Sequence, residues 1–484
     1  MQFHFRALTF VAALSALAAC GSGDDADVVR IALIGEPDAV FETGLRLSMP
    51  AQQVRAATVE GLVAIDETGA VVPALAERWI VTDDGMSYIF RLRNSDWPDG
   101  TTMTAEQVRD ALKRTLRDLS GTSLGLDLAP ISEVRAMTGR VIEIRLSSAM
   151  PDFLQLLAQP ELGIFHKGKG TGPMELTQAG TAARLSLLPP ETRGLPTSDD
   201  WREGTRVLAL EAMPARQAVD AFSAGDVDIV LGGTIVDLPL APTGPLSRGN
   251  IRLDAARGLL GLRVLRAEGL LAEPARREAL ALAIERETLL APFNIAGWIP
   301  STRIAPVAVV GEGAAERWTN ASIEQRRADA RRRIAGFEGP KTITVALPEG
   351  PGADLLLREI AADWREVGVN AVRARSGQPA DLELVDTLAR YGSRRWFLNQ
   401  FACRVRRVLC DPKADELVQA ANREADPAAR ATLLAEAETR LTAQQGYIPL
   451  GAPVRWSLVR GDISGFIENN WAIHPLYPLA LAPR

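Results

Sequence analysis

The chain has 484 residues, of which 47% are hydrophobic and 24% are charged, and its formal net charge is −6. These values are those of an ordinary globular protein, so they exclude a disordered, collagen-like or coiled-coil chain. At roughly 150 residues per folding unit, the length predicts about three units. An acidic balance argues against a duplex nucleic-acid binder, which needs a concentrated basic face, so we expect no nucleic-acid partner.

The first twenty residues predict export. Residues 7–19 form an uncharged apolar run behind Arg6, which is typical of a signal peptide and too short to cross a bilayer of about 30 Å. The run ends in Leu17-Ala18-Ala19-Cys20, which resembles a bacterial lipobox. This resemblance implies a signal peptide over residues 1–19, a lipidated tether over residues 20–27 and an anchor at Cys20 on the periplasmic side of a bacterial membrane. The alternative is an ordinary signal peptide beside an incidental cysteine.

Strand-like and helix-like patterns then alternate along the chain. Period-2 patterns predict strands at residues 28–34, 88–93, 141–146, 206–211, 227–231, 262–266, 342–347 and 369–372. Helices are predicted after a capping box at Thr104 and Gln107, from Pro274 to residue 290, up to a stop at Gly368, and from Asp426 to Gly446. Alternating strands and helices without internal repeats indicate an α/β fold.

No catalytic constellation stands out. Residues 121–125 fit the G-x-S-x-G pattern of serine hydrolases, but they follow a predicted helix, whereas that motif needs a strand-to-helix turn. We interpret them as a turn that ends the helix. With His4, His166 and His474 as the only histidines, we expect no catalytic residues, no metal site and no cofactor. If carboxylates from distant segments lie together in the folded chain, the protein would instead be a lipid-anchored envelope hydrolase, and this alternative stays open.

Cysteines and tryptophans give the remaining candidates. Cys403 and Cys410 are close in sequence, and in an exported protein they predict a local disulfide. Trp298 and Trp396 lie outside strongly periodic segments, and Trp396 follows two arginines. Aromatic rings near arginine on a loop suit a ligand-binding cleft. The alternative for any one tryptophan is packing in the core.

A series of motifs points to a family. They lie, in order, at residues 60–63 (Glu60-Gly61-Leu62-Val63), 72–79, 83–93, 97–100, 104–108, 170–173, 221–229, 273–287, 446–450 and 465–466. In order and spacing they resemble the bacterial extracytoplasmic solute-binding proteins of family 5, the peptide- and nickel-type receptors of ABC importers.

The resemblance implies a two-lobed, periplasmic-binding-protein-like α/β fold of the oligopeptide-receptor type with an extra inserted subdomain. Lobe I would comprise residues 28–59, 170–256 and 455–484; the inserted subdomain, residues 60–169; and lobe II, residues 257–454. The implied function is capture of peptides or related small molecules by hinge closure, outside the cytoplasmic membrane. The expected partners are ABC permease subunits with cytoplasmic ATPases, and we expect a monomeric binding protein, not an enzyme.

The ligand region departs from the family pattern. Peptide receptors of the family typically place an aspartate shortly before the cysteine pair, but residues 388–395 contain no acid, and Asp386 is the nearest. Arg390, Arg394 and Arg395 would suit a carboxylate or phosphate group, because guanidinium groups bind such anions with two hydrogen bonds. The alternative is that these arginines belong to a solvated loop.

The resulting candidate ligand contacts are Phe41, Trp298, Asp386, Arg394, Trp396 and Asn399. The class of ligand stays open, because an opine, an anionic or phosphorylated compound, a metal chelate or an oligosaccharide would also fit a receptor of this kind. A sensor that reports ligand occupancy is a further alternative.

Overall fold

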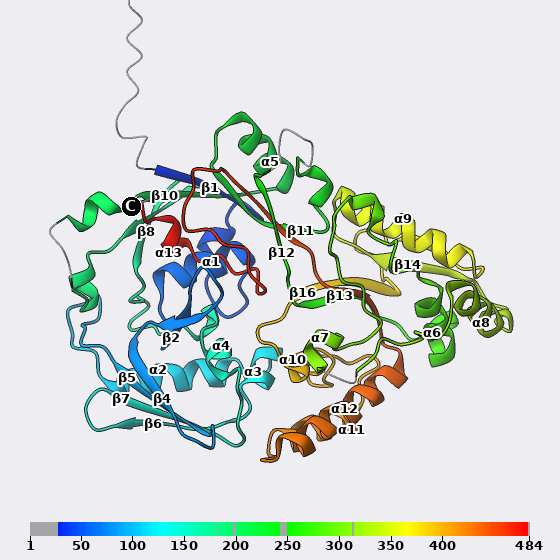
Figure 1. The fold of residues 1–484 in the computed structure, drawn as a ribbon, viewed down its shortest axis with the longest axis horizontal. Helices are drawn as coiled ribbons and strands as arrows, with labels where there is room; N and C mark the ends of the chain where they lie inside the picture. Colours follow the sequence, from blue (N-terminus) through cyan, green and yellow to red (C-terminus); the bar gives the residue numbers. More distant parts are fainter. Residues whose placement is uncertain (1–27, 181, 197–199, 243–248, 312–313, 483–484) are drawn as a thin grey trace, which may run out of the picture.

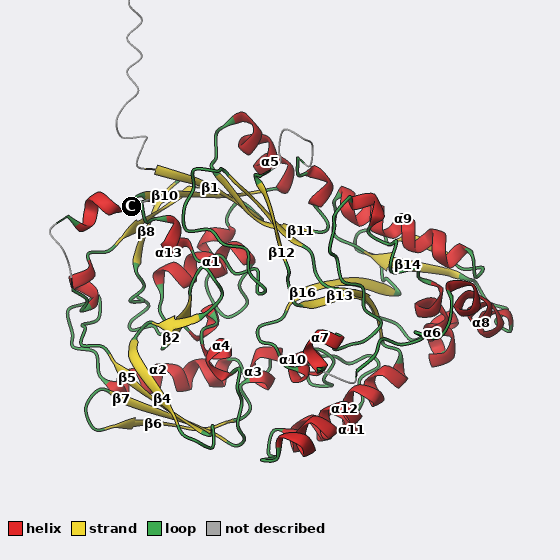
Figure 2. Cartoon of the chain, in the orientation of Figure 1, coloured by secondary structure: helices red, strands yellow, loops and turns green. Residues whose placement is uncertain are grey.

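The computed structural model describes residues 28–180, 182–196, 200–242, 249–311 and 314–482. The predicted signal peptide, the tether and Cys20 lie outside these ranges. Figures 1 and 2 show two α/β halves, one built on strands β1, β10 and β11 and the other on β13, β14 and β16. Within the described ranges, no helix combines the length and apolar character that crossing a membrane requires.

The first half is built on a seven-stranded sheet with the order β12-β18-β11-β1-β10-β9-β8. Its central strand β1 is parallel to both β10 and β11. Strand β1 is almost continuously apolar because both faces of a parallel strand are covered. The strands are β1 (Val28–Ile34), β8 (Met174–Ala179), β9 (Ala182–Leu187), β10 (Val207–Met213), β11 (Ile229–Thr234), β12 (Ile251–Asp254) and β18 (Arg455–Val459). Its helices are α1 (Met49–Thr58), α5 (Ala215–Ala224) and α13 (Leu476–Leu479).

A smaller antiparallel sheet with the order β4-β5-β7-β6 lies below the first half in Figure 1. Helix α2 packs against β6 and β7, and its N-terminus carries the capping box predicted from Thr104 and Gln107. The strands are β4 (Ala76–Val81), β5 (Ser87–Leu92), β6 (Ile131–Met137) and β7 (Val141–Leu146), with a separate hairpin of β2 (Val63–Ile65) and β3 (Val71–Pro73). The helices are α2 (Ala105–Asp118), α3 (Ser123–Asp127) and α4 (Phe153–Leu157).

The second half is built on a five-stranded sheet with the order β15-β14-β16-β13-β17. The strands are β13 (Gly258–Val264), β14 (Thr342–Ala346), β15 (Asn370–Arg373), β16 (Leu382–Leu388) and β17 (Tyr447–Gly451). The helices are α6 (Pro274–Ala283), α7 (Val307–Val310), α8 (Ile323–Ala335), α9 (Pro351–Arg365), α10 (Arg394–Asn399), α11 (Pro412–Ala421) and α12 (Pro427–Gln444). Each sheet falls within one of the units predicted from the sequence, and the exact unit boundaries stay a proposal.

The chain passes from the seven-stranded to the five-stranded sheet at residues 255–257 and returns at residues 452–454. Asp386 of β16 and Arg455 of β18 form an ion pair beside the return crossing, with 2.7 Å between Oδ1 and Nη1. Both side chains are mostly buried. A hinge between two halves is formed by a few connecting residues, and these two crossings are the connections between the two sheets.

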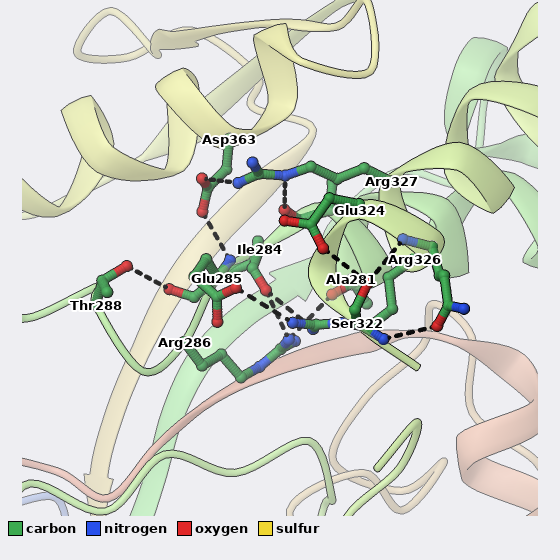
Figure 3. Close-up of polar contacts among 12 residues, drawn as sticks. Ala281, Ile284, Glu285, Arg286, Thr288, Ser322, Glu324, Arg326, Arg327 and Asp363 are labelled. Atoms are coloured by element: carbon green, nitrogen blue, oxygen red, sulfur yellow. Dashed lines mark hydrogen bonds and ion pairs between the residues drawn. The ribbon is translucent and has the colours of Figure 1, made fainter. Parts of the chain in front are cut away.

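The helix predicted from Pro274 to residue 290 ends early, at Ala283. The backbone becomes extended at Ile284, and the amide of Glu285 donates to the Asp363 carboxylate at 2.8 Å, as Figure 3 shows. Arg286 is buried and donates to the carbonyl of Ala281, and burial lowers the pKa of Arg286 to about 9. Asp363 of α9 and the Arg286 side chain thus pair backbone groups that a longer helix would have paired.

The G-x-S-x-G segment, which we predicted to be a turn that ends a helix, also contains the start of a second helix. Helix α2 ends at Asp118, and Thr122 then caps a new helix, α3, through a hydrogen bond from the amide of Gly125. The motif therefore joins two helices, which is not the strand-to-helix setting that a catalytic serine requires.

Candidate ligand-binding site

The three predicted aromatic contacts pack against other protein groups, and only Trp396 is fully buried. Trp396 is 1% exposed and lies edge to face against Phe397 in α10. Trp298 is half-buried, and its indole donates to the carbonyl of Ala452 at 2.8 Å. Phe41 packs against the core of the first half. None of the three lines either cavity described below.

The predicted polar contacts also have protein partners. Asp386 pairs with Arg455, and burial raises the pKa of the Asp386 carboxyl. Arg394 forms an ion pair with Glu438, with 3.2 Å between Nε and Oε2. Asn399 is buried and donates to another carboxylate, described next. Their role as ligand contacts stays a prediction.

Helix α10 lies beside α3 (Figure 1), and the buried Asp127 carboxylate of α3 binds residues of α10 and of the segment before it. Asp127 Oδ1 accepts hydrogen bonds from the Tyr391 hydroxyl at 2.8 Å and from Asn399 Nδ2 at 2.7 Å. Arg395 donates to the Asp127 carbonyl at 3.3 Å. Burial raises the pKa of Asp127 to about 6, although Asn399 and Arg395 act in the opposite direction. We call these residues the α3–α10 contact.

A second contact joins the halves next to the first. Arg390 binds Glu161 with two hydrogen bonds, of 2.8 and 3.0 Å, and also donates to Gln159 Oε1 at 3.3 Å. Arg390, Arg394 and Arg395 are all at least half-buried, so the solvated-loop alternative is wrong. Their proposed binding of an anionic ligand stays a prediction, and it would require the present protein partners to be displaced.

A cavity of about 370 Å³ lies beside this second contact. Its wall comes from α1, the β2–β3 hairpin, residues 158–163 and the C-terminal segment around α13. Leu388, at the end of β16, contributes from the second half, and Gln159 joins the wall to Arg390. The wall is largely apolar, and its buried polar side chains are Gln53, Glu60 and Gln159. This size falls within the usual range of roughly 300–1,000 Å³ for small-molecule sites.

Glu60 holds two guanidinium groups at the cavity wall. Its Oε2 accepts from Arg93 and its Oε1 from Arg193, each at 2.5 Å. Glu60 and Arg93 are 5% and 4% exposed, so both charges are removed from water and each is stabilised by the opposite charge. Both oxygens of the Glu60 carboxylate are therefore already paired with arginine side chains.

Trp471 is an aromatic residue at the junction of the halves that we did not select from the sequence. Arg257, at the first crossing, lies over its ring at 5.6 Å. A side chain on Gly392 of the second half would contact the ring, and one on Gly69 of the β2–β3 turn would collide with it. Trp471 is followed directly by Ala472 and Ile473 of the cavity wall.

Three further residues of the cavity wall, Glu60, Gln53 and Arg193, were also not predicted from the sequence. Glu60 begins the first family motif, so its position was visible in the sequence without its role. Gln53 and Arg193 resemble ordinary surface residues, and only the tertiary structure brings them to the cavity.

A second cavity, of about 420 Å³, lies between residues 148–152 and the segments 392–395 and 421–434. Arg394 is the one predicted contact in its wall. Burial raises the pKa of Asp152 there, against the influence of Arg395. Within the described ranges, no group of three or more histidine, cysteine or acidic side chains is arranged to hold a metal ion.

Cys403 and Cys410 are joined by a disulfide, with their Cα atoms 5.0 Å apart. The bridge closes a short loop directly before α11. The amide of Cys403 also donates to Asp415 of that helix at 3.0 Å, which holds the loop against α11.

Comparisons with known proteins agree with this architecture. The sequence model described as bacterial extracellular solute-binding proteins, family 5, middle region, matches residues 70–191. The periplasmic oligopeptide-binding protein OppA of Salmonella typhimurium is 22% identical over 475 residues, which cover 87% of this chain and 86% of that protein. The probable deoxycholate-binding periplasmic protein YgiS of Escherichia coli is 34% identical over 129 residues, which cover 21% of this chain and 23% of that protein.

The fold is similar to that of Haemophilus influenzae OppA in complex with the peptide RPPGFSPFR. The TM-score is 0.79 at 17% identity, and the match covers 94% of this chain and 99% of that one. This likeness confirms the expected two-lobed α/β fold. Together, the family model that matches residues 70–191, a relative that aligns along nearly the whole chain and the shared fold support the assignment of this chain to family 5 of the bacterial extracellular solute-binding proteins.

Proposed function

We propose that the chain captures a small ligand in the cavity beside Gln159 and presents it, in the closed form, to the permease of an ABC importer. The observation that carries the proposal is the position of this cavity. Its wall includes Gln159 and Leu388, so the groups that surround the ligand also bring the halves together. A ligand that binds the closed form better than the open form would shift the molecule toward closure.

The test is native mass spectrometry of the protein purified from its host, followed by calorimetry. We expect a small molecule that leaves only on denaturation and that binds again to the emptied protein. Small-angle scattering of the emptied protein should show a larger radius of gyration, which returns to the smaller value when the ligand is added. A protein that retains no ligand, binds none from a host extract and keeps one radius would contradict the proposal.

The predicted anchor at Cys20 is part of the proposal. We propose that lipidation of Cys20 holds the protein, as a monomer, on the periplasmic side of the membrane. Radiolabelled palmitate should be incorporated into the wild-type protein and not into Cys20→Ala, with Cys403→Ser as the control that keeps its label. Equal labelling of all three would mean that Cys20 is not the anchor.

A further inference from the structure

The cavity wall offers a ligand mostly apolar surface. Its apolar side chains include Met49, Val59, Val63, Ile65, Leu388 and Ile473, contributed by four separate segments of the chain. Burial of apolar ligand surface here would supply most of the binding free energy, as in other small-molecule sites. A predominantly polar ligand would lose its hydration without replacement partners.

One buried polar side chain in the wall has no hydrogen-bond partner within the described part of the chain. Gln53, on α1, is 9% exposed and lines the cavity, and its side-chain amide forms no hydrogen bond with any described residue. Its neighbour Gln52 instead donates to the carbonyl of Leu47 at 3.0 Å. The amide atoms of Gln53 are not among the enclosed side-chain atoms that lack a partner, so they are open to the cavity, where they can donate to and accept from a bound molecule.

The buried charges of the wall do not favour a cation. Glu60 is the buried acid of the wall, and it is already paired with Arg193 of the wall and with Arg93, which does not line the cavity. Asp66 and Glu67 also line the cavity, but they are only half-buried, and Asp66 Oδ1 accepts from the amides of Thr68 and Ala70 in the hairpin turn. An ammonium group in the apolar part would therefore be desolvated without an unpaired buried carboxylate, because the carboxylates of Asp66 and Glu67 lie in the half-exposed hairpin turn.

We propose that the ligand is an apolar molecule that carries no ammonium group, and that its polar end accepts or exchanges hydrogen bonds with the Gln53 amide. This inference rests on the proposed function, because it names the ligand class of the same cavity. The polar end would be a carbonyl, a hydroxyl or a carboxylate, all of which the Gln53 Nε2 donors can pair.

Three probes of similar size separate the possibilities by calorimetry on the emptied protein. N-acetyl-leucyl-leucine amide is neutral, N-acetyl-leucyl-leucine carries a carboxylate, and leucyl-leucine amide carries an ammonium group. We expect at least one acetylated probe to bind roughly tenfold or more tightly than the ammonium probe, and the stronger of the two identifies the polar end. Equal or tighter binding of leucyl-leucine amide would overturn the inference.

The Gln53→Leu variant tests the hydrogen bonds directly, because leucine keeps the approximate volume and removes the amide. Binding of the preferred acetylated probe should weaken roughly tenfold, whereas Gln378→Leu, at an exposed turn, should leave it unchanged. Unchanged affinity in Gln53→Leu would overturn the role of Gln53 and would indicate that its amide only holds a water molecule. If Gln53→Leu does not fold, Gln53→Glu replaces it: the added carboxylate should reverse the order of the probes.

The ligand retained from the host separates this inference from the proposed function. A retained molecule with an ammonium group would overturn the inference and leave ligand capture intact. A retained molecule without one supports both, even where none of the three probes fits. A protein that retains nothing and binds no probe would contradict the proposed function itself.

Discussion

Arg390 and Glu161 join the two halves of the molecule through two parallel hydrogen bonds, of 2.8 and 3.0 Å, beside the cavity wall. The Glu161 side chain is 2% exposed, and that of Arg390 is 26% exposed. Planar guanidinium and carboxylate groups that meet in this way are stronger and more directional than a single ion pair. Because the two residues come from different halves, the pair forms only when the halves are together.

Removing one partner should therefore favour the open form. In Arg390→Met the buried Glu161 carboxylate loses both hydrogen bonds, and we expect the closed form to lose about 2–4 kcal/mol relative to the open one. The measurement is the radius of gyration by small-angle scattering, with and without the retained ligand. Arg358→Met, which removes an exposed arginine of α9, is the control.

The double variant Arg390→Met with Glu161→Met adds a second test of the same pair. Replacing both charges by apolar groups leaves no carboxylate unpaired, so it should disturb closure less than Arg390→Met alone. If the double variant is as open as the sum of the two single variants, the pair does not hold the halves together.

Asp127 should make the stability of the protein depend on pH. Burial raises its pKa from the ordinary 3.8 to about 6, so the folded protein binds this proton at pH values where the unfolded chain has released it. The contribution to stability is complete below about pH 4 and is lost as the pH rises through about 6. Protonation at Oδ2, which has no partner among the described groups, would leave the Oδ1 hydrogen bonds from Tyr391 and Asn399 in place.

The measurement compares urea unfolding of the wild type and Asp127→Asn at pH 4.5, 5.5 and 7. Asparagine keeps an oxygen acceptor and does not titrate, and all other acids are the same in both proteins. Relative to the variant, the wild type should lose on the order of 1–3 kcal/mol of its free energy of unfolding between pH 4.5 and 7. A difference that stays constant across this range would show that Asp127 does not titrate there.

Local sequence patterns predicted those parts of the fold whose structure is decided locally. Strand β1 has its predicted bounds because its apolar run is long, and α2 begins where Thr104 and Gln107 form their capping box. The end of α6 at Ala283 could not be predicted from local patterns. The amide of Glu285 donates to Asp363, which belongs to a helix distant in sequence.

The candidate site was harder to predict for a related reason. Trp396 follows two arginines, a setting that suits a binding loop, but Ser393 caps a short helix there and turns the ring into the core. Gln53 is a polar residue in an ordinary helical pattern, and only the tertiary structure, which places α1 against α13, brings it to the cavity wall. Periodicity reports which face of an element is apolar, but not which distant element will cover the other face.

The disulfide should stabilise the folded protein moderately. A bridge that closes so short a loop restricts the unfolded chain by about 2 kcal/mol. The variant with both Cys403→Ser and Cys410→Ser should lose about that much free energy of unfolding, measured by urea denaturation without reductant. Reductant should lower the stability of the wild type to that of the variant and leave the variant unchanged, whereas a wild type that is insensitive to reductant would contradict a stabilising bridge.

Trp471 should couple ligand binding to closure. Its ring lies under Arg257 at the first crossing, and the amide of Arg257 donates to the carbonyl of Asn470 at 3.2 Å. The amide of Trp471 donates to Asn469 Oδ1 at 3.0 Å, so the ring sits on an anchored loop that continues into the cavity wall. Removing the ring would take away the surface on which the second half closes. A cation–π contact of this kind contributes about 0.5–2 kcal/mol, depending on how far it is desolvated.

We therefore expect Trp471→Ala to bind the host ligand roughly three- to thirtyfold more weakly by calorimetry, which is the same range expressed as affinity. Trp471→Phe keeps a ring beneath Arg257 and should recover most of the affinity. Trp201→Ala is the matched control, because Arg202 lies over that ring at 5.3 Å and Trp201 lines neither cavity. If Trp471→Ala and Trp201→Ala bind the ligand equally well, the Trp471 ring only packs the loop, and closure must depend on Arg390 and the α3–α10 contact instead.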